Sequence, residues 1–316
     1  MSALHLGLTP WVGDLGGGAD RIAEQASRAE DMGFASLWLP ESHFVGRGAC
    51  PSPLLILAAA ASRTRNLKLG TTSFLLPIRN PLHAAEEVAT LDRISNGRVI
   101  LGLGRGFRRA LFEAFNVPVR EKRDRFEAAL ELMVRAWAGE PVSHNGGEPV
   151  RLSPLPVQLP HPPLWVAAFG PKAVTQAGRL GLPYLASPME SVARLRENYD
   201  LHRRVKADAG HPADGPVPVM RTVFVAESPD LLSRVREGLR HQMQELRASP
   251  SSILRRRAEV DLDDWALVGE RGRVADEIQR YREDLGMTHL VVRGAFPATE
   301  PEDRVRSLAA LGGLFA

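Results

Sequence analysis

The sequence predicts an α/β protein in which a single (β/α)8 barrel domain takes up residues 1–316. Short runs rich in leucine and β-branched residues alternate with longer amphipathic stretches, which gives about eight strand–helix units. Strands that alternate with helices pair in parallel, because each crossover returns the chain in the same direction. No G-x-G-x-x-G motif joins the first strand to its helix, which favours a closed barrel over an open doubly wound sheet.

The amino-terminal half is expected to contain the first four units. Ile22, Ala26 and Ala29 share one face of the first helix, and Gly33 is well suited to end that helix. The expected strands are Leu4–Thr9, Ser36–Leu39, Leu67–Leu76 and Val99–Leu103, and the expected helices are Asp20–Met32, Pro53–Ser62, Leu82–Ile94 and a helical region from about Arg108 to Gly139.

The amino-acid composition changes after the fourth unit. The segment Glu140–Pro163 is rich in proline and glycine and predicts a small insertion, compatible with a hairpin. The polar, arginine-rich segment Ala248–Asp264 follows the seventh strand and is either a lid over the barrel mouth or an exposed helix pair. The remaining expected strands are Leu164–Ala168, Tyr184–Ala186, Val217–Val225 and His289–Val292, and the remaining helices are Lys172–Leu180, Ser191–Ala209, Pro229–Leu246, Arg273–Leu285 and Glu302–Leu311.

Composition excludes several classes of function. Cys50 is the one cysteine, so the chain has no intrachain disulfide, which is typical of a reducing cytoplasm. We find no signal peptide and no run of about 18 apolar residues, so no membrane association is expected. The net charge is only +3 and the arginines are spread along the chain, which argues against nucleic-acid binding. The histidines show no metal-binding spacing, so no metal is expected.

Two strand ends are suited to an anion, and the carboxyl ends of the strands are where a barrel places its active site. Gly104 and Gly106 let the backbone approach a ligand closely, and Arg105 between them offers a planar fork of donors for a phosphate. Gly170 and Pro171 open a helix, whose first turn presents free N–H groups and a positive dipole end. Together these features predict a phosphorylated cofactor, and NAD remains compatible with them.

Longer motifs add a specific resemblance. The stretch that runs from Arg28 to Leu39-Pro40-Glu41-Ser42-His43-Phe44 resembles the second unit of the bacterial-luciferase-like flavin-dependent monooxygenases. Similar motifs follow in the family's order, and the resemblance covers most of the chain and is dense from residue 28 to 106. These motifs lie at residues 58–64, 69–71, 76–81, 89–106, 268–269 and 286.

The resemblance implies an enzyme that binds reduced FMN and uses molecular oxygen on a small organic substrate. A separate flavin reductase would supply the reduced FMN in a transient encounter. Members of the family form dimers, so the resemblance also implies a homodimer. Arg105 would bind the flavin phosphate, and Glu41 would help to position the isoalloxazine ring. The residues expected to hold the flavin are Thr72, Ser73, Gly104, Arg105, Gly106, Gly170, Pro171, Lys172 and Ala173.

One departure from the family pattern concerns the catalytic groups. Bacterial luciferase carries a catalytic histidine directly after the glutamate, whereas this chain carries Ser42 there and retains the following histidine as His43. Proton transfer would therefore need His43, water or the substrate, and light emission from a long-chain aldehyde is not expected. His43 is either a general acid/base or a histidine packed against its strand-end neighbours. Family members often have a non-prolyl cis peptide where Thr72-Ser73 stands.

Two alternatives stay open. Relatives with the same fold use a deazaflavin coenzyme and transfer hydride, and an arginine-dominated composition is typical of the GC-rich genomes in which such coenzymes occur; the Glu-x-His-Phe motif favours FMN. The second alternative is a non-catalytic flavin-binding subunit, which Ser42 supports.

Overall fold

A computed structural model describes residues 3–11, 18–248 and 260–315 of the chain. The chain divides into two compact units, and each is described by itself. Unit 1 takes in the described residues of 1–13, 28–38 and 166–316, and unit 2 those of 14–27 and 39–165. Helix α1 (Ala19–Asp31) and strands β2 and β6 contribute residues to both units.

Unit 1 contains a parallel sheet. Strand β1 pairs in parallel with β2 and β10, β10 pairs with β8, and β8 pairs with β9. Strand β6 pairs in parallel with β7. The strands are β1 (His5–Leu8), β2 (Ser36–Leu39), β6 (Leu164–Ala167), β7 (Tyr184–Leu185), β8 (Pro218–Val225), β9 (Ala266–Gly269) and β10 (His289–Arg293).

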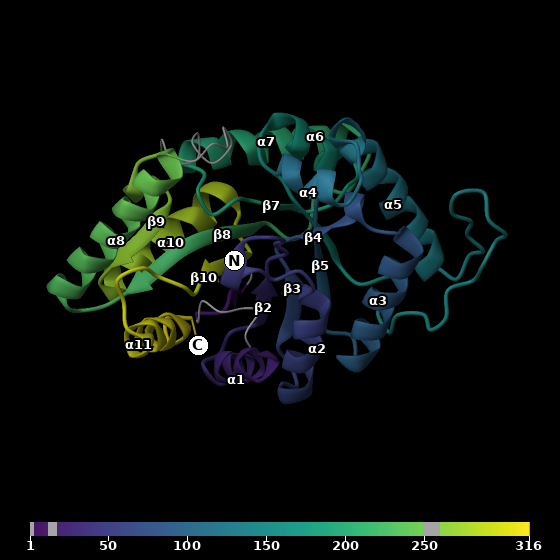
Figure 1. Ribbon diagram of the computed structural model, residues 1–316. Coiled ribbons are helices and arrows are strands. Elements are labelled where there is room, and N and C mark those ends of the chain that lie inside the picture. Colours follow the sequence, from purple (N-terminus) through teal and green to yellow (C-terminus); the bar gives the residue numbers. More distant parts are fainter. Residues whose placement is uncertain (1–2, 12–17, 249–259, 316) are drawn as a thin grey trace. The chain divides into compact units, whose positions relative to one another are not determined.

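Long helices pack on this sheet and on one another. Helix α6 lies against α7, α10 contacts α7, β8 and β9, and α11 contacts β8 (Figure 1). Serine residues at the N-caps of α7 and α8 accept hydrogen bonds from the first turn, as good helix starts require. The helices of this unit are α6 (Pro171–Arg179), α7 (Val192–Asp208), α8 (Pro229–Arg247), α10 (Arg271–Leu285) and α11 (Pro301–Gly312).

Unit 2 has a second set of parallel strands and helices. Strands β3 and β4 both pair in parallel with β5. Helix α3 begins after the N-cap Asn80, whose side chain accepts hydrogen bonds from the backbone of Leu82 and His83, and it packs against α2 and α5. The elements are β3 (Lys68–Thr71), β4 (Phe74–Leu75), β5 (Val99–Gly104), α2 (Pro53–Arg63), α3 (Pro81–Ile94), α4 (Arg109–Ala114), α5 (Lys122–Trp137) and short 3-10 helices at Gly46–Gly48, Leu76–Ile78 and Val119–Glu121.

The segment between α5 and β6 contains no helix or strand. Val142 and Val150 form one antiparallel bridge. Farther along, the buried carboxylate of Asp92 on α3 accepts hydrogen bonds from Val157 N at 2.8 Å and from Gln158 N at 2.9 Å. A buried carboxylate needs such partners, so these contacts tie the segment to α3.

The predicted α/β architecture with parallel strands is confirmed, and three details of the prediction are wrong. The expected strand Leu67–Leu76 is interrupted at Thr72-Ser73, where the peptide bond is cis, and becomes β3 and β4. The expected helical region Arg108–Gly139 splits into α4 and α5, because Asn116 has φ 53° and Pro118 removes a backbone donor. Strand β9 was not expected.

The lid expected at Ala248–Asp264 falls largely on residues 249–259, which lie outside the described residues. Within it, Leu262–Asp264 forms a 3-10 turn just before β9. None of the described helices is long and apolar enough to cross a bilayer.

Candidate active site

Glu41 follows β2 and anchors a set of contacts in unit 2. Its side chain is fully buried, and its Oε1 accepts hydrogen bonds from Arg79 Nη1 at 2.6 Å and His43 Nε2 at 2.7 Å. Its Oε2 accepts from Leu75 N at 2.9 Å. A buried carboxylate is stable only with partners of this kind. Glu41 therefore fixes the position of His43 relative to the segment that follows β4.

His43 is held between Glu41 and aromatic rings. Its ring meets Phe115 edge-on, with centroids 5.1 Å apart, and lies 5.8 Å from the ring of Phe44. Arg108 Nη1 donates to the His43 carbonyl at 3.2 Å. In the bond to Glu41 the Nε2–H donates to a carboxylate, so a neutral ring keeps Nδ1 as its proton acceptor. The histidine predicted as a general acid/base thus has a defined orientation.

Exposed aromatic side chains lie beside His43. Phe44 is 68% exposed and Phe115 is 39% exposed, and their ring centroids are 6.1 Å apart. Phe44 also has φ 58°, in the left-handed region that bulky residues rarely adopt. A phenylalanine held there in solvent gives the surface next to His43 an apolar character.

Ser42, the departure from the family pattern, closes a loop. Ser42 and Cys50 form an antiparallel bridge, with Ser42 N donating to Cys50 O at 3.0 Å and Cys50 N donating to Ser42 O at 3.1 Å. The Ser42 hydroxyl accepts from Cys50 N at 3.0 Å and donates to Gly48 O at 3.4 Å. The backbone bridge therefore closes the loop that presents His43 and Phe44, and the Ser42 hydroxyl adds two hydrogen bonds to it.

Cys50 itself is fully buried. Burial, and to a smaller extent the nearby Glu41 carboxylate, raises the pKa of its thiol to about 11. The thiolate is the nucleophilic form of cysteine, so this thiol is inert at neutral pH.

Arg105, at the end of β5, lies in a group of cations that we call the cation cluster: Arg105, Lys122 and Arg123. Burial, and to a smaller extent Arg123, lowers the pKa of Arg105 to about 10, with Glu127 acting in the opposite direction. Burial and then these two arginines also lower the pKa of Lys122. Lys122 and Arg123 open α5, where the helix macrodipole adds positive potential. Such a concentration of positive charge is suited to a phosphate.

The backbone beside the cation cluster comes close to Ser73. A Cβ built on Gly104 would lie 1.9 Å from Ser73 Oγ, so only glycine fits there. Gly106 has φ 69°, and Thr72 N donates to Leu39 O at 2.7 Å. The predicted residues Thr72, Ser73, Gly104, Arg105 and Gly106 are therefore found at the ends of β3 and β5 in unit 2.

The other predicted cofactor residues belong to unit 1. Gly170 has φ 81° and is the N-cap of α6, Pro171 follows at the first helical position, and a Cβ on Gly170 would meet nothing within 4 Å. Lys172 is exposed, and Ala173 N donates to Gly170 O at 3.1 Å. That these residues serve the same ligand as Arg105 stays a prediction.

Sequence reasoning missed the residues that surround the predicted ones. Arg79, the ion-pair partner of Glu41, stands in the Ile78-Arg79-Asn80 stretch that was matched to the family without a role. Lys122 and Arg123 lie in a helix whose charges look like an ordinary solvated face. An arginine directly before an N-cap asparagine was the available signal for Arg79.

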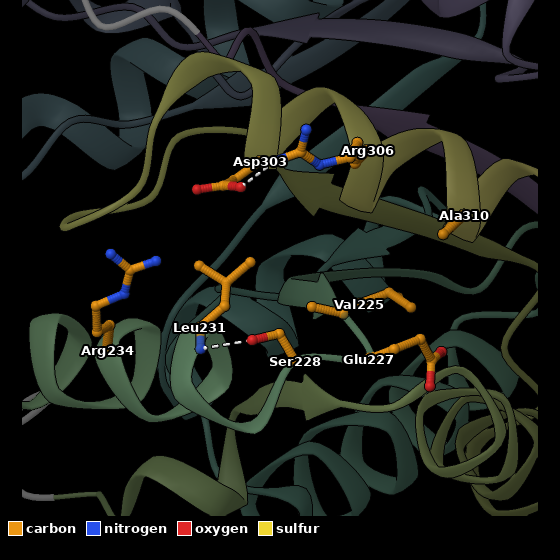
Figure 2. A pocket seen from close by; sticks show the side chains of 9 residues that line it. Val225, Glu227, Ser228, Leu231, Arg234, Asp303, Arg306 and Ala310 are labelled. Carbon is orange, nitrogen blue, oxygen red and sulfur yellow. Dashed lines mark hydrogen bonds and ion pairs between the residues drawn. The ribbon is translucent and has the colours of Figure 1, made fainter.

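A cavity in unit 1 lies away from these groups. It has a volume of about 450 Å³ and lies between the start of α8 and α11 (Figure 2). Among its charged lining residues Arg306 contacts Asp303 at 2.6 Å, and Ser228 Oγ caps α8. It contains none of the predicted site residues. In the described part of the chain, His, Cys, Asp and Glu side chains do not gather in threes as a metal site would need.

The chain matches a protein family and curated relatives. The family model described as luciferase-like monooxygenase matches residues 6–289. An uncharacterized protein of Sinorhizobium fredii is 33% identical over 66% of this chain and 62% of its own length. The oxygenase component of the flavin-dependent trigonelline monooxygenase of Acinetobacter baylyi is 27% identical over 66% of this chain and 60% of its own length. The matches thus span less than two thirds of these relatives.

Solved structures share the fold over nearly the whole chain. Monooxygenase RslO1 from Streptomyces bottropensis is 26% identical, with a TM-score of 0.84 over 98% of both chains. The oxygenating constituent of 3,6-diketocamphane monooxygenase from Pseudomonas putida, solved with FMN, is 21% identical, with a TM-score of 0.82 over 99% of this chain and 98% of its own. An F420-dependent secondary alcohol dehydrogenase is 19% identical, with a TM-score of 0.81 over 100% of both chains.

The similarity to the last two structures, at 21% and 19% identity, shows the fold alone. The family model, which extends over most of the chain, shows the family as well. This chain belongs to the luciferase-like monooxygenases.

Proposed function

We propose that this chain is the oxygenase component of a two-component flavin monooxygenase. It would take reduced FMN from a separate reductase in a transient encounter and use molecular oxygen on a small organic substrate. The observation that carries the proposal is the buried Glu41, which orients His43 and pairs with Arg79. The relative named as the oxygenase component of a flavin-dependent monooxygenase, and the related fold that was solved with FMN, support it.

The residues of unit 2 fit a flavin phosphate. The cation cluster supplies concentrated positive charge, which a phosphate dianion would offset. Gly104 lets backbone and ligand approach beside Ser73, and we assign the start of α6, at Gly170–Ala173, to the same cofactor. Reduced FMN, when bound, supplies the electrons that activate oxygen.

His43 is the group we assign to proton transfer. Its Nε2 is engaged by Glu41, so its Nδ1 would accept a proton from the substrate or return one to it. Phe44 and Phe115 flank the ring and would exclude water from an apolar substrate. Glu41 positions His43 and would position the isoalloxazine ring from the same side.

We further propose that the two units together form one (β/α)8 barrel domain, with the segment 140–163 as its insertion. A homodimer is the quaternary state expected from the family, and a reducing cytoplasm is the compartment expected from the lone, buried Cys50. Size-exclusion chromatography with light scattering tests the dimer.

The competing function is hydride transfer with the deazaflavin coenzyme F420, which the fold of the F420-dependent dehydrogenase favours. Anaerobic titration of the purified protein with reduced FMN and with reduced F420 separates the two. We expect saturable binding of reduced FMN and, with a flavin reductase present, oxygen consumption. Binding of F420 alone would refute the FMN proposal, and FMN binding without any effect on oxygen consumption would favour a non-catalytic subunit.

Variants sharpen this test. Arg105→Gln should weaken FMN binding by about 10- to 100-fold and leave riboflavin binding unchanged, because a charge-assisted bond to the phosphate is lost. Arg109→Gln, on the exposed surface of α4, is the matched control. His43→Asn should leave FMN binding intact and remove substrate oxygenation, with the consumed oxygen released as hydrogen peroxide. Unchanged oxygenation in His43→Asn would contradict the assigned role.

A further inference from the structure

Arg293 ends β10, the central strand that pairs with β1 and β8 in unit 1. Its register partner on β8 is Thr222. One residue earlier on β8, Arg221 points toward the helices, because its Nε donates to Tyr281 on α10. Successive side chains of a strand point to opposite faces, so Thr222 and Arg293 point to the face away from α10.

A row of polar side chains crosses the sheet at this level. Thr9 N donates to Val292 O at 2.8 Å, which continues the β1–β10 ladder and brings Thr9 opposite Arg293. Thr9 Oγ1 accepts a hydrogen bond from Gly294 N at 3.1 Å. Thr9, Arg293 and Thr222 therefore stand side by side at the carboxyl ends of β1, β10 and β8.

The guanidinium of Arg293 is poorly matched by the protein. Its one hydrogen bond is from Nη1 to Thr222 Oγ1 at 3.5 Å, the outer limit of such a bond. Among the described residues no carboxylate pairs with it. By contrast, the buried Arg221 donates to Tyr281, to Ser187 O at 3.2 Å and to Glu190 O at 2.9 Å. The chain thus surrounds Arg221 with hydrogen-bond acceptors and leaves Arg293 with a single weak acceptor.

The guanidinium of Arg293 is also partly removed from water, so its missing hydrogen-bond partners are not fully replaced by solvent. Arg293 is half-buried, and desolvation lowers the pKa of its guanidinium. Arginine nevertheless stays protonated in proteins, so the positive charge persists in a poorly solvated place. A charge held this way is unfavourable until an anion pairs with it. The planar fork of donors is matched best by the two oxygens of a carboxylate or phosphate.

We propose that Arg293, flanked by the hydroxyls of Thr9 and Thr222, binds an oxyanion, and that this oxyanion is a carboxylate of the substrate. The assignment to the substrate rests on the proposed function; the anion site does not. In the proposed function the cation cluster of unit 2 takes the flavin phosphate, which leaves Arg293 for the substrate. The test must therefore distinguish a substrate carboxylate from a phosphate as the anion that Arg293 binds.

The test uses benzoate and inorganic phosphate as probes on the full-length protein, by isothermal titration calorimetry with and without FMN. Wild-type protein should bind benzoate. Arg293→Gln should weaken benzoate binding by about tenfold or more, and Arg293→Lys should retain part of it, because the charge remains while the fork is lost. Arg306→Gln, an exposed arginine of the same unit, should bind benzoate like the wild type. Equal benzoate affinity in wild type and Arg293→Gln would overturn the proposal.

Two further readouts keep the inference falsifiable. Because Arg293 has no ion-pair partner among the described residues, Arg293→Gln should melt at the wild-type temperature or above it; a melting temperature lowered by more than 5 °C would mean a structural role and overturn the proposal. Arg293→Gln should also bind FMN and riboflavin as the wild type does. A selective loss of FMN affinity would identify the flavin phosphate as the anion and overturn the substrate assignment.

The two proposals fail separately. Protein that binds benzoate through Arg293 but does not bind FMN would remove the proposed function and leave the anion site. Protein that binds FMN and consumes oxygen but does not bind benzoate would remove the anion site and leave the proposed function.

Discussion

Replacing Arg79 with methionine removes the cation that pairs with the buried Glu41. The ion pair is 2.6 Å long, the Glu41 side chain is fully buried, and the Arg79 side chain is 17% exposed. With about 4 Å between charge centres and an effective dielectric constant near 20, the attraction is about 4 kcal/mol. The variant also no longer carries the cost of partly desolvating Arg79, which offsets some of this loss, so we expect Arg79→Met to lower the unfolding free energy by about 2–3 kcal/mol. The melting temperature should fall by about 3–5 °C.

Urea unfolding of Arg79→Met, Glu41→Gln and the double variant measures this effect as a cycle. The double variant leaves no unpaired charge, so its loss should be smaller than the sum of the single losses by about 1 kcal/mol or more. The control is Arg109→Met: its ion pair with Glu113 is 2.7 Å long but exposed, and its loss should be below about 0.5 kcal/mol. If Arg79→Met were no more harmful than Arg109→Met, or if the cycle were additive, burial would not be what strengthens the Glu41 pair.

Three other expectations follow from the same physical arguments. Burial first, then the neighbouring His5, lowers the pKa of His289 from 6.5 to about 4, so the stability from its neutral form is full above pH 6.5 and falls toward pH 4. After a discount for partial exposure the loss is about 1–2 kcal/mol. His289→Gln should therefore reduce the pH dependence of the melting temperature between pH 7.5 and 4.5. Cys50, with a pKa raised to about 11, should resist iodoacetamide at pH 7.5 in the native protein and react within minutes in 6 M guanidinium. Gly104→Ala meets Ser73 Oγ at 1.9 Å and should cost about 1–3 kcal/mol together with flavin affinity, whereas Gly48→Ala meets nothing within 4 Å and should cost neither.

The alternation of strands and helices was readable from the sequence because each element has its own periodicity of apolar residues. Strand β5 and helix α3, for example, were predicted within one or two residues of their observed bounds. The break between β3 and β4 was not readable, since Thr71, Thr72 and Ser73 in the middle of Leu67–Leu76 also occur within ordinary strands and nothing in the sequence marks an interruption there. Strand β9 was missed because its few residues follow a long polar segment.

The sequence offers candidate site residues where a residue type has few other uses. Glycines around Arg105 and a histidine two residues after Glu41 are such cases. Arg79 and Arg293 were missed because arginine is the common basic residue of this chain and usually belongs to a solvated face. Only the burial of Glu41, and the single weak acceptor beside Arg293, distinguish them.

The loop closed by Ser42 and Cys50 has a consequence for protein engineering. Exchanging Ser42 for histidine, to restore the luciferase pattern, would remove the hydroxyl bonds to Cys50 N and Gly48 O and leave the loop that carries His43 with its backbone bridge alone. A grafted motif would therefore lose part of the support of its loop in the same step. Randomised libraries aimed at new substrates should keep both bridge residues and Gly46, whose φ of 70° requires glycine, and should vary Phe44 and Val45 at the exposed tip of the loop.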